Sequence, residues 1–405
     1  MKKKGYVAVL KSVGRVMKDT SPRLLFKFSY LFMWKSAWNL HRFTKRQKAG
    51  KPFFPAFLMI SVTEACNLSC SGCWVSEGGR KSLTVKQLDG IIQSAKGKGS
   101  YFFGILGGEP LLHQGLLEVL KKHADCYFQL FTNGTLITEK LAFQLKKLGN
   151  VTPLISIEGL EQESDRRRGK DQVFSKSVEG LRACKKAGLI VGVAASICKS
   201  NYEELVSPQY IKRLLQEGVH YVWYYIYRPV GSKPEVENAL NQEQILGLRR
   251  FLVEQRTQAP ILIVDAYWDE NGQALCAGAT GMSHHIAPSG ALEFCPPIQM
   301  AADFINEDGS NVVQLFEQST FLEAFRLHVA DRTRGCIIMD DPEDMTAFLS
   351  QQKVTDATSR QSVMHEYACM KPCPSHDMGS QAIPETNPLY RMLKKKYFFG
   401  FGAYG

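Results

Sequence analysis

The chain has 405 residues, of which 44% are hydrophobic and 22% charged, so it is a folded protein of two or three domains and not a disordered one. Its formal net charge is +11, but residues 1–50 hold thirteen Lys and Arg against one acid, and the rest of the chain is nearly neutral. A nucleic-acid-binding protein of this size usually spreads its basic residues over a folded face, so this distribution argues against nucleic acid as a partner.

Residues 1–50 form a basic and aromatic segment of their own. The stretch 24–38 adds six aromatic side chains to the basic residues. It is too short and too charged to span a bilayer, and no signal-peptide pattern accompanies it. Two structures fit: a helix that lies in the membrane interface, or a helix packed on the body with its lysines in solvent. Lysines 394–396 and the aromatic tail after them repeat the pattern at the other end of the chain.

Residues 55–230 alternate between short apolar runs and helical patterns. Repeated strand-then-helix units predict a parallel sheet with crossover helices. We therefore expect an α/β fold, either a partial (β/α)6 TIM-like barrel of parallel strands or an open doubly wound sheet, with its chemistry at the carboxyl ends of the strands. The predicted strands cover 56–63, 101–106, 127–132, 153–159, 189–196 and 219–227, and the predicted helices cover 84–99, 115–124, 139–149, 175–188 and 209–218.

We expect four parts along the chain. The basic segment 1–50 is followed by an α/β core at 51–235, a linker region at 236–275, and a cysteine-rich C-terminal domain with the basic aromatic tail at 276–405. The sixth predicted strand places four aromatic side chains on one face. Such a face fits the interior of a barrel that shapes an apolar substrate pocket, or plain core packing, which we expect for most of the four.

Three cysteines, Cys66, Cys70 and Cys73, stand within eight residues in the loop after the first predicted strand. Clustered thiols in a large chain without a secretory signal indicate metal binding or catalysis in a reducing cytosol. A structural zinc site needs four protein ligands. Three thiols instead suit three corners of a cubane iron–sulfur cluster, whose fourth iron stays open for a small molecule.

The spacing of these cysteines resembles the signature of the radical S-adenosylmethionine (SAM) superfamily. Three further motifs follow in the family's order, at the ends of the second, third and fourth predicted strands: GGEP (107–110), TNGT (132–135) and SIEG (156–159). The resemblance covers residues 55–230. One departure is Gly72, where most members have an aromatic residue before the third cysteine. The glycine and the run 107–113 are similar to radical enzymes of hopanoid lipid synthesis.

The resemblance implies a [4Fe–4S] cluster on Cys66, Cys70 and Cys73, with SAM bound to its open iron. Electron transfer would then cleave SAM to a 5′-deoxyadenosyl radical, with flavodoxin or ferredoxin as electron donor. The residues expected to contact SAM are Gly107, Gly108 and Glu109 at the amino group, Ser156 and Glu158 at the ribose, Ser196 and Asn201 near the adenosine, and Trp74 at the adenine. Gly107 and Gly108 also fit a plain strand-to-helix turn, and Ser156 fits a hydrogen-bonded strand hydroxyl.

A second group of cysteines, Cys276, Cys295, Cys336, Cys369 and Cys373, lies near the C-terminus. Its spacing resembles the auxiliary-cluster domains called SPASM or twitch. Five thiols suit one auxiliary [4Fe–4S] cluster, with Cys276, Cys295, Cys336 and one of the last two as ligands. A zinc site built from the same residues is the alternative. The other three thiols, at Cys126, Cys184 and Cys198, fit buried, inert positions.

The function expected from this resemblance is that of a radical SAM enzyme, an oxidoreductase or transferase that functionalises an unactivated C–H bond. A lipid or isoprenoid-derived substrate at an anionic membrane surface is slightly favoured, with the protein in the cytoplasm and peripheral to the inner face of the membrane. The first alternative is a peptide-modifying enzyme, although residues 1–50 are too short and too basic for a leader-binding module. The second is a zinc- or cluster-bearing interaction module without activity.

Overall fold

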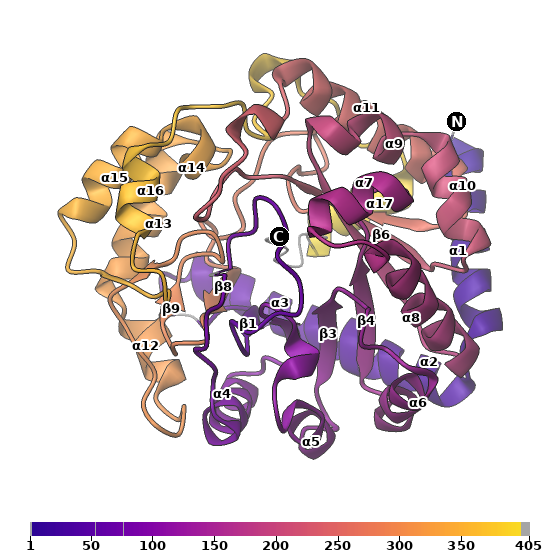
Figure 1. Cartoon of the computed structure of the whole chain (residues 1–405), viewed down its shortest axis with the longest axis horizontal. Coiled ribbons are helices and arrows are strands. Elements are labelled where there is room, and N and C mark those ends of the chain that lie inside the picture. Colours follow the sequence, from indigo (N-terminus) through magenta and orange to yellow (C-terminus); the bar gives the residue numbers. More distant parts are fainter. Residues whose placement is uncertain (1, 53, 76, 398–405) are drawn as a thin grey trace.

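The computed structural model describes residues 2–52, 54–75 and 77–397. Its helices surround a mostly parallel sheet, and the helices between residues 312 and 368 (α12 to α16) gather to one side, beside β8 (Ser283–Ile286) and β9 (Leu292–Glu293) (Figure 1). The aromatic tail after residue 397, expected to dock on the body or touch lipid, lies outside these residues. In the described part of the chain, no helix is long and apolar enough to cross a membrane.

The elements occupy the following residues. The strands are β1 Phe57–Ser61, β2 Phe102–Leu106, β3 Tyr127–Thr132, β4 Val151–Ser156, β5 Gly192–Ile197, β6 Tyr221–Ile226, β7 Leu262–Val264, β8 Ser283–Ile286, β9 Leu292–Glu293, β10 Met300–Ala301 and β11 Thr355–Asp356. The helices are α1 Lys2–Asp19, α2 Pro22–Lys27, η1 Phe28–Trp34, α3 Lys35–Lys48, α4 Val85–Gly97, η2 Pro110–Leu112, α5 Leu116–Lys122, α6 Glu139–Leu148, α7 Glu161–Arg168, α8 Val173–Ala187, η3 Lys199–Asn201, α9 Tyr202–Leu205, α10 Pro208–Gln216, η4 Val236–Asn238, α11 Gln242–Gln258, α12 Val312–Gln318, α13 Thr320–Arg332, α14 Ile337–Asp340, α15 Pro342–Ser350, α16 Val363–Ala368, η5 Gly379–Gln381 and α17 Pro388–Tyr397.

All six predicted strands are present and pair in parallel, which confirms the predicted fold class. The sheet is larger than predicted, because its order is β7-β6-β5-β4-β3-β2-β1-β8-β9. Residues 236–275, predicted as a linker, contain α11 and β7, and β7 pairs in parallel with β6. From the predicted C-terminal domain, β8 pairs in parallel with β1. Local sequence patterns could not show this pairing, since more than 200 residues separate the two strands.

The helices around the barrel begin and end where their sequence signals predict. Thr84 and Gln87 form a capping box that starts α4, and the Thr138 hydroxyl accepts a hydrogen bond from the backbone of α6. Gly149 and Gly188 end α6 and α8 in the left-handed conformation, with φ of 72° and 77°. These caps fix where the helices begin and end, and they thereby help to position the strand ends and the motif loops.

The N-terminal segment packs on the barrel and is exposed at the same time. Leu24, Leu31 and Phe43 are buried. Arg23 and Lys27 donate to the carbonyls of Lys147 and Leu148 at the end of α6, at 2.8 and 2.9 Å, where the helix dipole favours a cation. The outer faces of α1, η1 and α3 nevertheless carry many exposed apolar side chains. The inner face of these helices therefore packs on the body of the protein. This packing does not account for the exposed apolar side chains of the outer face.

The barrel interior is partly aromatic. Trp223 and Tyr225 of β6 pack inside with Leu154, Ala194 and Val264. Tyr224 points the other way, into the main core, where its hydroxyl donates to the Leu205 carbonyl at 3.0 Å. The alternation of β6 therefore directs Trp223 and Tyr225 into the barrel and Tyr224 away from it.

A buried group of charges fastens the C-terminal helix to the sheet. Asp265, just after β7, pairs with Lys394 of α17 at 3.1 Å and with Arg256 of α11. Arg256 also pairs with Glu385 at 2.7 Å, and the fully buried Arg249 lies nearby. Lys394 was predicted to join a basic cluster at a membrane surface. That expectation is wrong for Lys394, because its ammonium group is buried and paired with Asp265.

Replacing Glu385 with Gln should lower the free energy of unfolding by about 3–5 kcal/mol, because it removes one partner of a buried ion pair and leaves Arg256 undercompensated. Glu139→Gln makes the same chemical change in an exposed pair with Lys186 and should cost less than about 1 kcal/mol. Denaturant midpoints of the two variants measure the difference. Equal losses would show that the buried group does not hold α17.

Candidate functional site

The three clustered cysteines open onto a large cavity. Cys66, Cys70 and Cys73 lie on an irregular loop after β1, at the carboxyl end of the barrel. The cavity holds about 1000 Å³, and its wall includes the three cysteines together with Gly107, Gly108, Trp74, Ser156 and Arg168. Thr132 and Asn133 line it as well, so the structure brings residues of all four motifs to one site at the ends of neighbouring parallel strands.

Glycines let the end of β2 lie directly against the cysteine loop. A Cβ on Gly107 would stand 2.6 Å from the Thr63 carbonyl oxygen, and one on Gly108 would stand 2.5 Å from that of Ala65. At this close approach Gly108 N–H donates to Thr63 O and Glu109 N–H donates to Ala65 O, both at 2.8 Å. The plain-turn explanation of the two glycines is therefore satisfied, and their contact with SAM stays a prediction.

The Glu109 side chain is buried and faces the protein instead of the cavity. Its carboxylate accepts hydrogen bonds from the Thr132 hydroxyl at 2.8 Å and from the backbone of Asn133 and Leu111 at 2.8 and 3.1 Å. Burial raises the pKa of this carboxyl group. Glu109 therefore ties the loop after β2 to the TNGT loop after β3, which keeps two cavity walls in register.

Four residues expected at the ribose and adenosine fall into two groups. Ser156 lines the cavity, whereas Glu158, Ser196 and Asn201 lie outside its wall. Glu158 accepts from the Ser196 backbone at 2.9 Å, and Asn201 donates to the carbonyls of Glu158 and Ser196, each at 2.9 Å. These three residues bind the ends of β4 and β5 to each other. Their direct contact with a nucleoside remains a prediction.

Arg168 is a site residue that the sequence analysis missed. From the end of α7, its guanidinium donates to Glu158 Oε1 at 2.6 Å and lies 3.6 Å from Cys70 Sγ. Burial raises the pKa of Cys66, and burial followed by the nearby Cys70 raises that of Cys73 to about 12. A fixed cation beside crowded thiols favours their anionic form. Three thiolates with this countercharge fit a bound iron–sulfur cluster, as does the open space in front of them.

The glycine that replaces the expected aromatic residue has a structural explanation. Gly72 has φ of 64°, and a Cβ at this position would overlap the ring of Tyr227. Tyr227 follows β6, and its hydroxyl accepts a hydrogen bond from the Glu235 backbone at 3.2 Å. An aromatic ring from a distant strand therefore occupies the space beside the third cysteine. Trp74 also lines the cavity, with its ring 5.9 Å from that of His285.

The second group of cysteines gathers beside the residues that follow β6. Cys276, Cys295 and Cys336 line a small cavity of about 20 Å³ together with Arg228 and Tyr267. Arg228 Nε donates to Cys336 Sγ at 3.2 Å. Burial lowers the pKa of this guanidinium, but the combined attraction of Cys336, Tyr267 and Cys295 outweighs burial and raises it. A buried cation thus faces each of the two thiol groups.

Cys373 and Cys369 differ in burial and in the groups that surround them. Burial, followed by the proximity of Cys336, raises the pKa of Cys373 to about 11, so Cys373 lies near Cys336. Cys369 is exposed at the end of α16, with His365 Nε2 at 3.9 Å. Four thiols on a buried set of loops fit either an auxiliary [4Fe–4S] cluster or zinc. Between the two predicted alternatives for the fourth ligand, the geometry favours Cys373.

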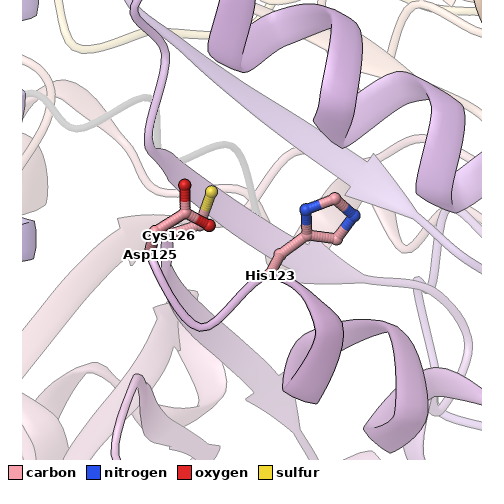
Figure 2. Close-up of side chains that lie close together, drawn as sticks. All are labelled: His123, Asp125 and Cys126. Atoms are coloured by element: carbon pink, nitrogen blue, oxygen red, sulfur yellow. The ribbon is translucent and has the colours of Figure 1, made fainter.

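A third set of metal-binding side chain types lies at the other end of the barrel. His123, Asp125 and Cys126, in the turn before β3, place one potential ligand atom each within 4.8 Å of the others (Figure 2). His123 Nε2 is paired with Asp89 at 2.9 Å, and Asp125 is paired with Lys96 at 2.9 Å. Burial raises the pKa of Cys126 to about 12. These groups are engaged with protein partners, and we assign no metal to them.

Comparison with protein families gives one match, to the Radical SAM superfamily over residues 60–207. Among curated proteins, the chain is similar to Fe-coproporphyrin III synthase of Methanosarcina barkeri, at 28% identity over 52% of this chain and 55% of that protein. It is also similar to the sporulation killing factor maturation protein SkfB of Bacillus subtilis, at 30% identity over 38% of each chain. The chain thus spans about half the length, or less, of these relatives.

Two solved structures share the fold. Streptococcus suis SuiB, solved bound to its precursor peptide SuiA, superposes with a TM-score of 0.59 at 16% identity, over 70% of this chain and 69% of that one. The structure of anSMEcpe with bound AdoMet superposes with a TM-score of 0.55 at 16% identity, over 77% and 93% of the two chains. Both matches extend well beyond residues 60–207, so the shared fold includes part of the C-terminal third.

Cys373→Ala should remove the metal of the second site, whereas Cys369→Ala should leave it in place, because only Cys373 lies beside Cys336. The two variants make the same change four residues apart. Iron, sulfide and zinc content after anaerobic reconstitution measure the outcome. Loss of metal in the Cys369 variant alone would contradict the geometric assignment.

Proposed function

Because residues 60–207 belong to the radical SAM superfamily, whose members are enzymes, we propose that this chain reductively cleaves SAM and functionalises an unactivated C–H bond. The observation that carries the proposal is the cavity of about 1000 Å³ that joins three thiols to the ends of parallel strands. When bound to these thiolates, a [4Fe–4S] cluster supplies the electron and the open iron that SAM cleavage needs. A flavodoxin or ferredoxin is the proposed electron donor.

The chain's own residues hold and orient the reactants. Cys66, Cys70 and Cys73 provide the thiolates, and Arg168 offsets their charge while Glu158 fixes its position. Ser156 and Trp74, on the cavity wall, are placed to contact the sugar and base of SAM.

The second site is proposed to hold an auxiliary [4Fe–4S] cluster on Cys276, Cys295, Cys336 and Cys373. Arg228, which faces Cys336, directly follows Tyr227, which covers Gly72 beside the first site. Two consecutive residues thus touch the two sites, so their separation is set by one rigid strand end. This arrangement suits electron transfer between the substrate and a second metal centre.

A peptide is the substrate class that the cavity favours. Its mouth carries both signs of charge: Lys233 pairs with Glu77 at 2.7 Å, and Arg80 and Glu235 lie on the same wall. Such a lining suits a polar, charged chain better than an isoprenoid. The likeness to SkfB and to SuiB, which was solved with a precursor peptide, supports the same choice.

A lipid substrate is the second candidate, and the outer face of the N-terminal helices favours it. In the described residues, ten of the seventeen exposed large apolar side chains lie between residues 6 and 38, including Leu10, Trp34 and Trp38 at 69%, 67% and 60% exposure. We propose that this face contacts an anionic membrane surface. The helices cover the base of the barrel, however, so the membrane would lie at the opposite end from the cavity. This placement moves our preference from lipid to peptide.

Cys70→Ala should abolish formation of 5′-deoxyadenosine, because the first site keeps only two thiols. Cys295→Ala should abolish product but retain part of the SAM cleavage, since it removes a ligand of the second site only. Cys184→Ala, a buried core thiol remote from both sites, is the control. Anaerobic assays with dithionite measure all three. Complete loss of cleavage in both site variants would mean that the second site supports the fold.

Leu10→Glu should weaken binding to anionic vesicles by about tenfold or more, because one apolar side chain buried in lipid is worth about 1.5–3 kcal/mol. Leu327→Glu, on α13 and also 67% exposed, should leave binding unchanged. Vesicle sedimentation at low and high salt measures both variants. High salt should weaken vesicle binding by the unmodified protein, because it screens the attraction between basic residues and anionic lipid. Binding that is absent, or equal in the two variants, would remove the support for the lipid candidate.

A further inference from the structure

The base of the barrel contains a second cavity, remote from the cysteines. It holds about 110 Å³ and lies between the barrel strands and helices from both chain ends. Trp223 and Leu262 come from the strands, Val16 and Phe32 from α1 and η1, and Tyr390 from α17. Tyr127 and Tyr221, at the amino ends of β3 and β6, also line it, which places it at the opposite end of the barrel from the motifs.

Most polar groups on the wall of this cavity already have hydrogen-bond partners. The Tyr127 and Thr152 hydroxyls share a short hydrogen bond, and Gln129 Nε2 donates to the Tyr221 hydroxyl at 3.2 Å. His220 Nδ1 accepts from the Val191 backbone at 3.2 Å, whereas its Nε2 makes no hydrogen bond within the described residues and lies 3.5 Å from Asp19. Burial lowers the pKa of His220 to about 4, which keeps the ring neutral at physiological pH. Apart from this one nitrogen, an occupant would touch aromatic and aliphatic surface.

An apolar occupant would make the dispersion contacts that the side chains around the empty cavity lack. Side chains that border a void lose dispersion contacts on one side. A buried water needs two to four polar partners, and the wall offers one unbonded nitrogen, so water gains little here. Apolar cavities of about 150 Å³ stay dry and bind benzene. A volume of about 110 Å³ is of the same order. It accommodates the end of a hydrocarbon chain and excludes a polar head group.

The helix that roofs the cavity also carries part of the exposed apolar face. Phe28 and Phe32 of η1 point to the cavity, whereas Tyr30, Met33 and Trp34 of the same helix are exposed by 47%, 57% and 67%. The segment is a π-helix, a rare conformation that is frequent at functional sites. A single helical segment thus separates an apolar cavity from a face suited to lipid.

From these observations we infer that the cavity at the base of the barrel is a binding site for the terminal part of a single hydrocarbon chain, as carried by a fatty acid or a membrane lipid. The site is independent of the radical chemistry, because no residue that lines it belongs to either cysteine group. It also does not depend on whether the substrate is a peptide.

The test uses 12-bromododecanoate as the probe, since bromine quenches tryptophan fluorescence on contact and Trp223 is part of the wall. The full-length protein should show saturable quenching with one site per chain. Trp223→Phe should lose this saturable component while calorimetry still detects binding. Quenching that persists in Trp223→Phe would place the probe at Trp34 or Trp38 on the surface and would overturn the proposal, as would the absence of saturable quenching.

Two filled variants and their matched controls locate the site. Val16→Phe extends a side chain into the cavity and should weaken binding tenfold or more, whereas Val13→Phe, on the exposed side of the same helix, should not. Leu262→Phe fills the cavity from the opposite wall, so it serves if Val16→Phe disturbs α1, and Leu327→Phe is its exposed control. Unchanged affinity in a folded, filled variant would overturn the proposal.

Vesicles whose lipids carry bromine on the terminal acyl carbons distinguish the two sources of the chain. If a membrane lipid supplies it, the vesicles quench Trp223, and Val16→Phe removes this quenching but not vesicle binding. If a free fatty acid supplies it, only the soluble probe quenches Trp223. Both results support a hydrocarbon site, and failure of both probes to reach Trp223 rejects it.

Discussion

The close contact between the end of β2 and the cysteine loop is the constraint on which the first site depends. A loop of three cysteines has no regular structure of its own to hold it. Here the backbone of Gly108 and Glu109 donates to the carbonyls of Thr63 and Ala65, and the missing side chains of the glycines allow the approach. Glu109 then extends the same restraint to the loop after β3. The thiols are thus positioned by strand geometry through two layers of hydrogen bonds.

Charge is arranged in the same way at both cysteine groups. Each has one buried arginine against a thiol, Arg168 at Cys70 and Arg228 at Cys336. A buried cation is costly unless it is paired, and so is a group of thiolates. Arg168 is held by Glu158, whereas Arg228 lies over the ring of Tyr267, with 5.7 Å from its guanidinium carbon to the ring centroid. Each arginine therefore places positive charge against a thiol, which favours the anionic form that binds metal.

Structural features that depend on short, local sequence patterns could be predicted from the sequence. Six strand–helix units, the cysteine spacing and the GGEP motif each occupy a short stretch and could be identified there. The seventh strand escaped notice because it is only three residues long, and β8 because its partner is far away in the chain. Arg168 stands in a run of three arginines that resembles an ordinary exposed helix end. Likewise, spacing alone could not choose between Cys369 and Cys373, since the choice depends on how α16 and the following loop fold back.

The pairing of β1 with β8 also sets an order of events during synthesis. Leu58 meets His284, which is made 226 residues later, so at about 5–20 residues per second the ribosome needs roughly ten to forty seconds to supply the partner. Until then β1 has a neighbour on one side only, namely β2. Such distant contacts form late in folding. The loop with Cys66 is therefore made early, whereas the sheet that it extends from is completed only after residue 286 has been synthesised.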